Sequence, residues 1–135
     1  MSMDSSVLFV SSYFQDACAL DEMLRQVSVA VVHATGLKEA VRKMEAVWFP
    51  VVLTEAKLED GSWQDLLGLT RSEGAELVVT DPFADPRFWA EAINLGAFDV
   101  LAQPFHGTEV QRVLASARSG QASSARGRFK AAAGR

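Results

Sequence analysis

Five short and mostly apolar runs, each four residues long, constrain the possible folds of this chain more than any other feature. Continuous apolar runs of this length are typical of strands that are buried on both faces of a parallel sheet. The runs lie at residues 7–10, 29–32, 51–54, 77–80 and 98–101. With 135 residues, the chain is long enough for one domain with a hydrophobic core and too short for two.

The segments between and after these runs repeat apolar residues every three or four positions, which predicts amphipathic helices. We expect the apolar positions of the first two helices to face inward, including Phe14 and Val27 in the first and Val47 in the second. The five helices are expected at residues 14–27, 37–47, 62–69, 85–94 and 108–118.

Capping and turn residues set the limits of several elements. The predicted N-caps are Ser62, Asp85 and Thr108. Asp65 would complete a capping box with the first of these, and Pro86 suits the first position of the fourth helix. Gly96 is a helix-stop residue. Residues 55–61 are predicted as a polar loop with a turn at Asp60 and Gly61.

Strands that alternate with helices indicate a parallel sheet with helices on both faces and right-handed crossovers. Such sheets bind or react at the carboxyl ends of their strands, near the point where the strand order reverses. Any local site is therefore expected at the residues that follow the five apolar runs.

Composition limits the compartment. No apolar run reaches the length of a membrane span, and the N-terminus lacks the positive region of a secretory signal. Cys18 is the only cysteine, so the chain cannot form a disulfide framework. We therefore expect a cytoplasmic protein with no membrane partner.

Charge divides the chain into two parts. Residues 1–117 hold all 17 acidic residues and 8 basic ones, a net charge of −9, whereas the last 18 residues hold 5 basic residues and no acid. We expect a domain over residues 1–118 and a flexible basic tail rich in Ala, Ser and Gly over residues 119–135. The acidic body argues against a nucleic-acid partner.

Two stretches resemble the response-regulator receiver family. Residues 51–61 are similar to its third strand, which ends in an Asp and is followed by a Pro-Asp-Gly-like turn. Residues 96–105, Gly-Ala-Phe-Asp-Val-Leu-Ala-Gln-Pro-Phe, look like its Gly-Ala-x-Asp-Tyr-Leu-x-Lys-Pro-Phe segment. The resemblance covers roughly residues 6–118 and implies a doubly wound, five-stranded parallel α/β sheet of flavodoxin-like receiver topology, with strand order 2-1-3-4-5.

Receivers transfer a phosphoryl group to the Asp that ends strand three. Two acids hold Mg²⁺, a Ser or Thr and a Lys hold the phosphoryl oxygens, and an aromatic residue on strand five changes rotamer. The corresponding positions here are Ser11 and Ser12 for the acids, Glu55 for the phosphoacceptor, Thr80, Gln103 for the Lys, and Val100 for the aromatic residue. Only the threonine is kept.

Hydroxyl groups replace carboxylates poorly around a hard divalent cation, and an amide brings no charge to a phosphoryl group. We therefore expect no cofactor, no receiver-type Mg²⁺ site and no enzymatic activity. The resemblance implies a degenerate, or pseudo-, receiver in a bacterial two-component phosphorelay pathway. Such a module would act by protein–protein interaction without Asp phosphorylation.

The expected partner is a protein: a kinase, an effector domain or a second copy of the chain. In the family, the face formed by helix 4, strand 5 and helix 5 commonly mediates dimers and docking. Phe88 and Trp89 are consecutive in the predicted fourth helix, so they point in different directions and one of them should be exposed. They are the candidate interface residues.

Four alternatives remain open. Ser11, Ser12 and Thr80 could bind a phosphate or nucleotide in a flavodoxin-like site, although no glycine accompanies them. A carboxylate such as Glu55 could still be phosphorylated. Glu55 could instead mimic the phosphorylated state. Four acids could collect a cation weakly if they share one sheet edge, namely Glu55, Glu59, Asp60 and Asp81.

Overall fold

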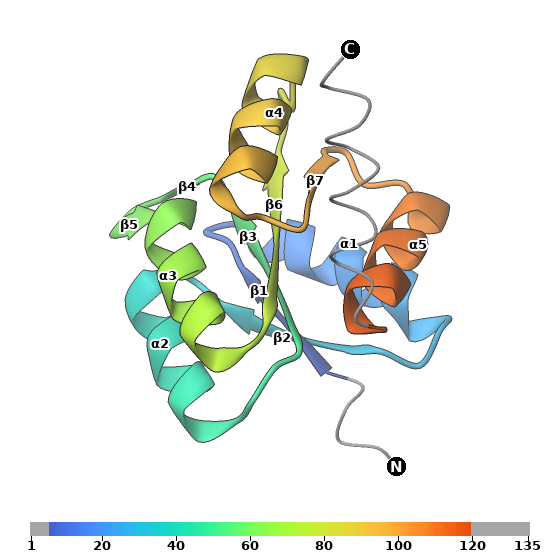
Figure 1. The fold of residues 1–135 in the computed structure, drawn as a ribbon. Coiled ribbons are helices and arrows are strands. Elements are labelled where there is room, and N and C mark those ends of the chain that lie inside the picture. The colour runs from blue at the N-terminus through green and yellow to red at the C-terminus, as the bar shows by residue number, and fades with distance from the viewer. Residues whose placement is uncertain (1–5, 120–135) are drawn as a thin grey trace.

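A five-stranded parallel sheet forms the centre of the computed structural model, which describes residues 6–119 (Figure 1). Its strand order is β2-β1-β3-β6-β7, all parallel. The strands are β1 (Ser6–Val10), β2 (Ala30–Ala34), β3 (Val51–Glu55), β6 (Glu76–Asp81) and β7 (Asp99–Ala102). Because β4 and β5 form a separate pair, this order is equivalent to the predicted 2-1-3-4-5, and the predicted fold class is confirmed.

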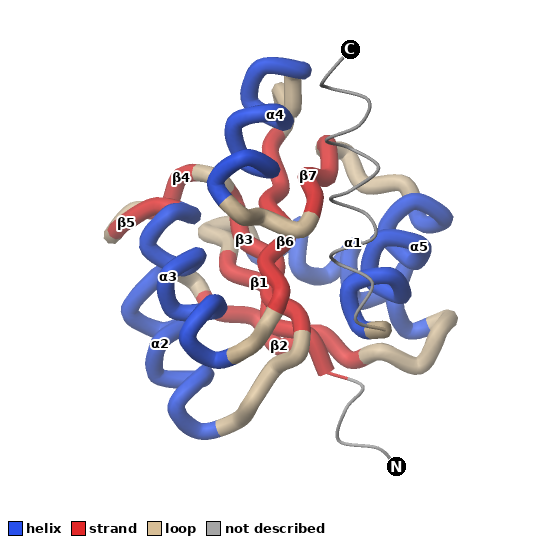
Figure 2. The backbone as a smooth tube through the Cα atoms, in the orientation of Figure 1, coloured by secondary structure: helices blue, strands red, loops and turns tan. Residues whose placement is uncertain are grey.

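Within residues 6–119, five helices cover both faces of the sheet, as predicted (Figure 2). Residues of α1 and α5 pack on one face, and residues of α2, α3 and α4 pack on the other. The helices are α1 (Phe14–Arg25), α2 (Leu37–Ala46), α3 (Trp63–Glu73), α4 (Pro86–Leu95) and α5 (Gly107–Arg118). Within residues 6–119, no helix is long and apolar enough to span a membrane.

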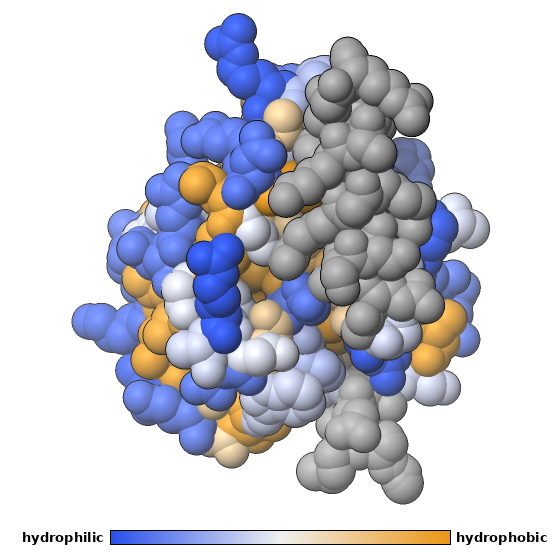
Figure 3. Space-filling view, in the orientation of Figure 1, coloured by the Kyte–Doolittle hydropathy of each residue, from blue (hydrophilic) through white to orange (hydrophobic). Residues whose placement is uncertain are grey.

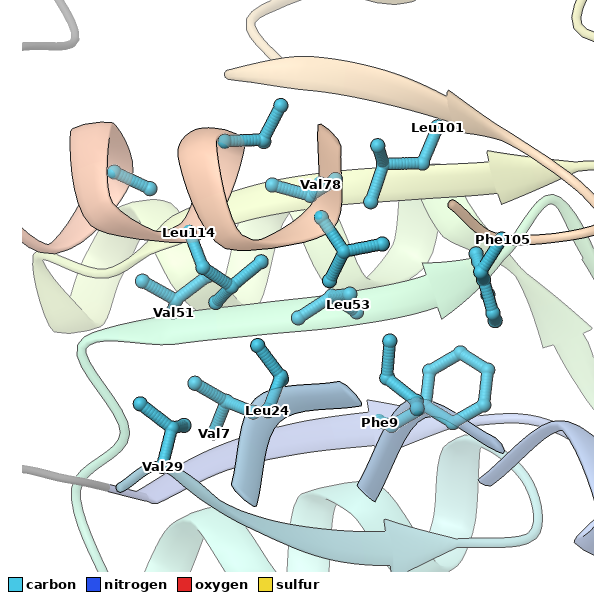
Figure 4. Packing of buried hydrophobic residues seen from close by; sticks show 14 of the residues in the cluster. Val7, Phe9, Leu24, Val29, Val51, Leu53, Val78, Leu101, Phe105 and Leu114 are labelled. Carbon is cyan, nitrogen blue, oxygen red and sulfur yellow. The ribbon is translucent and has the colours of Figure 1, made fainter. Parts of the chain in front are cut away.

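Alternation along each strand divides the core into two clusters. In β3, Val51 and Leu53 face α1 and α5, whereas Val52 faces α2 and α3. Figure 4 shows the first cluster, in which Leu114 of α5 and Leu24 of α1 lie over the strands. Burial of each such side chain contributes roughly 1.5–3 kcal/mol to folding.

Most predicted caps are confirmed. The Asp65 carboxylate accepts the Ser62 backbone N–H at 3.0 Å in a capping box, and Asp85 accepts the Phe88 N–H at 2.8 Å. Gly96 ends α4 with φ of +124°, a conformation that favours glycine. Thr108 is not a cap, because α5 begins at Gly107 with His106 as its N-cap.

The predicted polar loop at residues 55–61 is wrong in detail. Glu55 belongs to β3, and the next residues form a hairpin of two short antiparallel strands, β4 (Lys57–Leu58) and β5 (Gly61–Ser62). Helix α3 also runs past its predicted end to Glu73, where Gly74 stops it in a left-handed conformation.

Several predicted burial assignments are also wrong. Phe14, Val27 and Val47 are exposed, because Phe14 opens α1 at the surface and the other two follow the ends of α1 and α2. The predicted strand at residues 29–32 starts one residue later; in β2, Ala30 is exposed, the next three residues are partly buried and only Ala34 is buried. It is an edge strand, so only one side of it has a neighbour.

The predicted basic tail lies outside the described residues apart from Ser119, which is the C-cap of α5. Over the described surface in Figure 3, apolar residues occur in small groups between polar ones. Exposed aromatic side chains include Tyr13, Phe14, Trp48, Phe83 and Trp89.

Candidate functional site at the carboxyl ends of the strands

A row of polar residues crosses the sheet where its strands end. Because Val7, Phe9, Leu53, Val78 and Leu101 face the α1–α5 side, strand alternation directs the residues two positions further on to the same side. From β1 to β7 these residues are Ser11, Glu55, Thr80 and Gln103. We call these four residues the polar row. It gathers four of the six predicted site residues.

Glu55 is held inside the protein. It is only 9% exposed, and the Ser11 hydroxyl donates a 2.7 Å hydrogen bond to its Oε2. Ser11 is fully buried and also accepts the Tyr13 backbone N–H at 3.0 Å. Glu55 therefore points into the protein beside β1 and is not a solvated carboxylate at the end of β3.

The surroundings of Glu55 act on its charge in opposite directions. Burial raises the pKa of the Glu55 carboxyl, and the nearby Asp16 carboxylate raises this pKa further. Hydrogen bonds from Ser11 and from the Ser12 backbone N–H lower it, as does His33, but burial outweighs them. The protein therefore holds this carboxylate without a cation that fully offsets its charge.

Gln103 is engaged away from Glu55. Its side-chain amide donates to Asp16 Oδ2 at 3.0 Å, which joins the β7–α5 connection to the first turn of α1. Asp16 was not among the predicted site residues, because it lies on a helix and matches no position of the receiver motif. An acid one turn into the helix after Ser11 and Ser12 is the only signal that could have revealed it.

Thr80 has no hydrogen-bond partner for its hydroxyl. The side chain is fully buried, and Thr80 is the register partner of Glu55 in the β3–β6 pair. Its two neighbours in the polar row each bond elsewhere: Glu55 bonds Ser11, and Gln103 bonds Asp16. The side chains of Glu55 and Gln103 are therefore both hydrogen-bonded, but neither bonds Thr80.

His33 is a second residue that sequence reasoning did not assign to the site. Its Nε2 lies 2.8 Å from the Ser11 carbonyl oxygen, and its ring packs near Phe9 and Phe14 with centroid distances of 6.3 and 6.1 Å. The histidine thereby fixes the backbone of the residue that holds Glu55. Spacing in the sequence gave no signal for this contact.

The two remaining predicted positions play different parts. Ser12 is partly buried and contributes its backbone N–H to Glu55 rather than a hydroxyl ligand. Val100 is 7% exposed and belongs to the cluster on the opposite face of the sheet, so it lies outside the polar row.

Of the four acids considered for a weak cation site, Glu55, Asp60 and Asp81 each have separate hydrogen-bond partners. Asp60 accepts the Leu37 and Lys38 backbone N–H groups at the start of α2, which lowers the pKa of its carboxyl. Asp81 accepts the Phe83 N–H at 2.9 Å. Within residues 6–119, no three His, Cys, Asp or Glu side chains are grouped as metal ligands.

These donors do not fit the receiver Mg²⁺ site, because hydroxyls stand where two carboxylates are needed and Glu55 already bonds Ser11. An anionic phosphate at Ser11 would meet the Glu55 carboxylate, which opposes its binding. The arrangement suits a self-contained hydrogen-bonded cluster better than either ligand.

The two candidate interface residues differ in exposure. Phe88 packs edge-on against the buried Trp63, with ring centroids 6.2 Å apart. Trp89 is 37% exposed, and its indole N–H donates to Asp99 Oδ1 of β7 at 3.2 Å. Only Trp89 therefore presents aromatic surface beside β7.

Solved structures of receivers share this fold. The chemotaxis response regulator CheY4 of Vibrio cholerae is 18% identical, with a TM-score of 0.74 over 84% of this chain and 98% of that one. The beryllofluoride-activated NtrC4 receiver domain dimer is 22% identical, with a TM-score of 0.72 over 85% and 94%.

A response regulator from Burkholderia pseudomallei, solved with a phosphorylated aspartic acid and a calcium ion, is 22% identical. Its TM-score is 0.73 over 90% of this chain and 73% of that one. No protein-family model and no curated protein matches the sequence. The comparisons therefore establish a fold: the chain has the receiver fold found in two-component response regulators.

Proposed function

We propose that this domain is a receiver-type signalling module of a two-component pathway that acts through protein contacts, without phosphorylation of an aspartate and without enzymatic activity. The observation that carries the proposal is the state of Glu55. This residue stands at the phosphoacceptor position, is buried and accepts a hydrogen bond from Ser11. In a receiver, position 11 would itself be an acid.

Charge supports the same proposal. Phosphoryl transfer to a carboxylate needs cationic groups that offset the charge of the transferred group. At the lysine position this chain has Gln103, whose amide is already used by Asp16. Attack by Glu55 would also require the loss of its hydrogen bond to Ser11.

Intact-protein mass spectrometry after treatment with acetyl phosphate and Mg²⁺ tests the phosphorylation part. We expect no phosphoryl mass on the native chain. The matched positive control restores the receiver residues together, as Ser11→Asp, Ser12→Asp, Glu55→Asp and Gln103→Lys, and should gain the mass. Gain on the native chain would overturn the proposal and favour a receiver phosphorylated at a non-standard carboxylate.

The proposed contact surface is the face formed by α4, β7 and α5. Trp89 lies on this face, and its bond to Asp99 keeps the indole against β7 while leaving part of the ring exposed. Exposed aromatic side chains are enriched where proteins bind one another. The NtrC4 receiver, which has the same fold, is a dimer, so we propose self-association through this face.

Sedimentation velocity of the native chain over a range of concentrations tests this surface. We expect a concentration-dependent dimer that Trp89→Ala weakens about tenfold or more, as truncation of a central interface residue does. Phe83→Ala is the matched control, because Phe83 is an exposed aromatic outside the three elements of that face. A dimer equally sensitive to both changes, or no dimer, would refute the proposed surface.

A further inference from the structure

The polar row places Glu55 between two hydroxyl groups, and the structure uses only one of them. Ser11, which directly follows β1, lies on one side of Glu55, and Thr80 of β6 lies on the other, both toward the same face of the sheet. Neighbouring strands lie roughly 4.8 Å apart, so a Glu side chain can reach toward either. Glu55 bonds Ser11 at 2.7 Å.

The unused hydroxyl is the informative one. Buried hydroxyls nearly always have a partner, and leaving one without a partner costs free energy. Thr80 bears this cost in full, because its side chain is completely buried and its Oγ1 has no hydrogen-bond partner. A group beside it that changed partners would remove the cost, and Glu55 is its register partner.

We propose that Glu55 exchanges between two partners, Ser11 and Thr80, and that Ser11 is the positioning residue that selects the first. With Ser11 bonded, Thr80 stays without a partner; when the Ser11 contact is lost, the Glu55 carboxylate bonds Thr80. This deepens the proposed function and rests on it, because it gives a receiver fold without phosphorylation a second state of the same site.

The surface offers a place from which to drive the exchange. Ser11 accepts the backbone N–H of Tyr13, whose side chain is 63% exposed on the β1–α1 connection. A protein that binds Tyr13 and displaces this connection would draw Ser11 away from Glu55. Asp16 and His33 lie beside the same carboxylate, from α1 and β2, and would remain as its charged and titratable neighbours.

A double-mutant cycle on the full chain tests the exchange, with the ¹³C NMR titration of the Glu55 side-chain carboxyl as the readout. The variants are Ser11→Ala, Thr80→Val and the pair combined. Thr80→Val replaces the hydroxyl by a methyl group of similar size. Loss of one hydrogen bond to a carboxylate raises its titration midpoint by about one pH unit.

We expect Thr80→Val alone to leave the Glu55 midpoint unchanged, because the native carboxylate does not bond Thr80. In the Ser11→Ala background, the same change should raise the midpoint by about one unit, since Thr80 is then the partner. A Thr80→Val effect that is the same in both backgrounds, whether zero or not, would overturn the exchange.

Amide spectra of each variant check that the fold is kept. If Ser11→Ala does not fold, Ser11→Cys under reducing conditions serves instead, because a thiol keeps the size and is only a weak donor. The cycle is independent of the mass measurement above. A phosphoryl mass on the native chain would refute the proposed function without altering the cycle, and an additive cycle would refute the exchange alone.

Discussion

Residues 96–105 and the polar row share Gln103, but their other residues retain the receiver pattern to different degrees. In the first region, Ala97, Leu101 and Phe105 match the receiver segment, and all three are buried. In the polar row, three of four positions carry a different side chain, and two hydrogen bonds join them to each other or to Asp16. The fold therefore depends on the packing residues and does not require the receiver chemistry.

The largest effect should come from the packing region. Leu101→Ala truncates a fully buried side chain that packs between the sheet and the helices α1 and α5. The free energy of unfolding should therefore fall by about 2–5 kcal/mol. Urea unfolding measures this loss. Ala102→Ser, at an exposed position of the same strand, should change stability by less than about 0.5 kcal/mol. Equal effects at both positions would remove the distinction between packing and surface.

A cap next to the site should have an intermediate effect. Asp85→Ala removes the acceptor for the Phe88 N–H at the start of α4 and should cost roughly 1 kcal/mol by urea unfolding. Asp85→Asn keeps an acceptor and is the matched control, with a loss of only a few tenths of a kcal/mol. Equal losses for both changes would mean that the cap is not the cause.

Within the polar row, Glu55→Gln should change the pH dependence of stability. The pKa of Glu55 in the folded state is raised above its ordinary value near 4.5. The protonated side chain therefore stabilises the folded state fully below that pH, and this stabilisation is lost as pH rises through the raised pKa. The Gln variant has no such loss. Its stability relative to the native chain should therefore increase with pH over this window and then level off.

Urea midpoints measured from pH 4 to pH 8 give this comparison. Glu59→Gln is the control, because Glu59 is an exposed acid in the turn of the β4–β5 hairpin. A difference between Glu55→Gln and the native chain that stays constant with pH would contradict the burial of the Glu55 charge.

The smallest change in stability is expected for Gln103→Lys, within about 0.5 kcal/mol, because the new ion pair with Asp16 is only partly buried. The added cation should nevertheless lower the titration midpoint of Glu55 in NMR. Gln103→Met, which removes the amide without adding charge, should not lower it. If the Glu55 midpoint falls in both variants, the effect comes from the loss of the hydrogen bond between the Gln103 amide and Asp16, and not from the added charge.

The sequence was sufficient to predict the alternation of strands and helices, since short apolar runs and helical spacing depend on neighbouring residues alone. The strand order and the positions of Glu55 and Thr80 at adjacent strand ends followed from the resemblance. Alternation also explains why Val100, one residue from Leu101, faces the opposite side.

The contacts inside the site could not be predicted in this way. Asp16 and Gln103 are 87 positions apart, and no local pattern indicates which acid an amide will meet. The burial of Glu55 depends on its contacts with Ser11 and Ser12, which lie 44 and 43 positions away in the sequence. The β4–β5 hairpin was missed because two-residue strands are too short to show alternation.

The contact between α3 and the end of α4 restricts which sequences this fold can tolerate. Arg71 donates to the Leu95 carbonyl at 2.8 Å, and its guanidinium occupies the space where a Cβ at Gly96 would lie, only 2.0 Å away. A side chain at position 96 would displace the arginine and also strain a backbone with φ of +124°. Positions 71 and 96 should therefore vary together among relatives of this chain, so that an arginine is kept only where the glycine is kept.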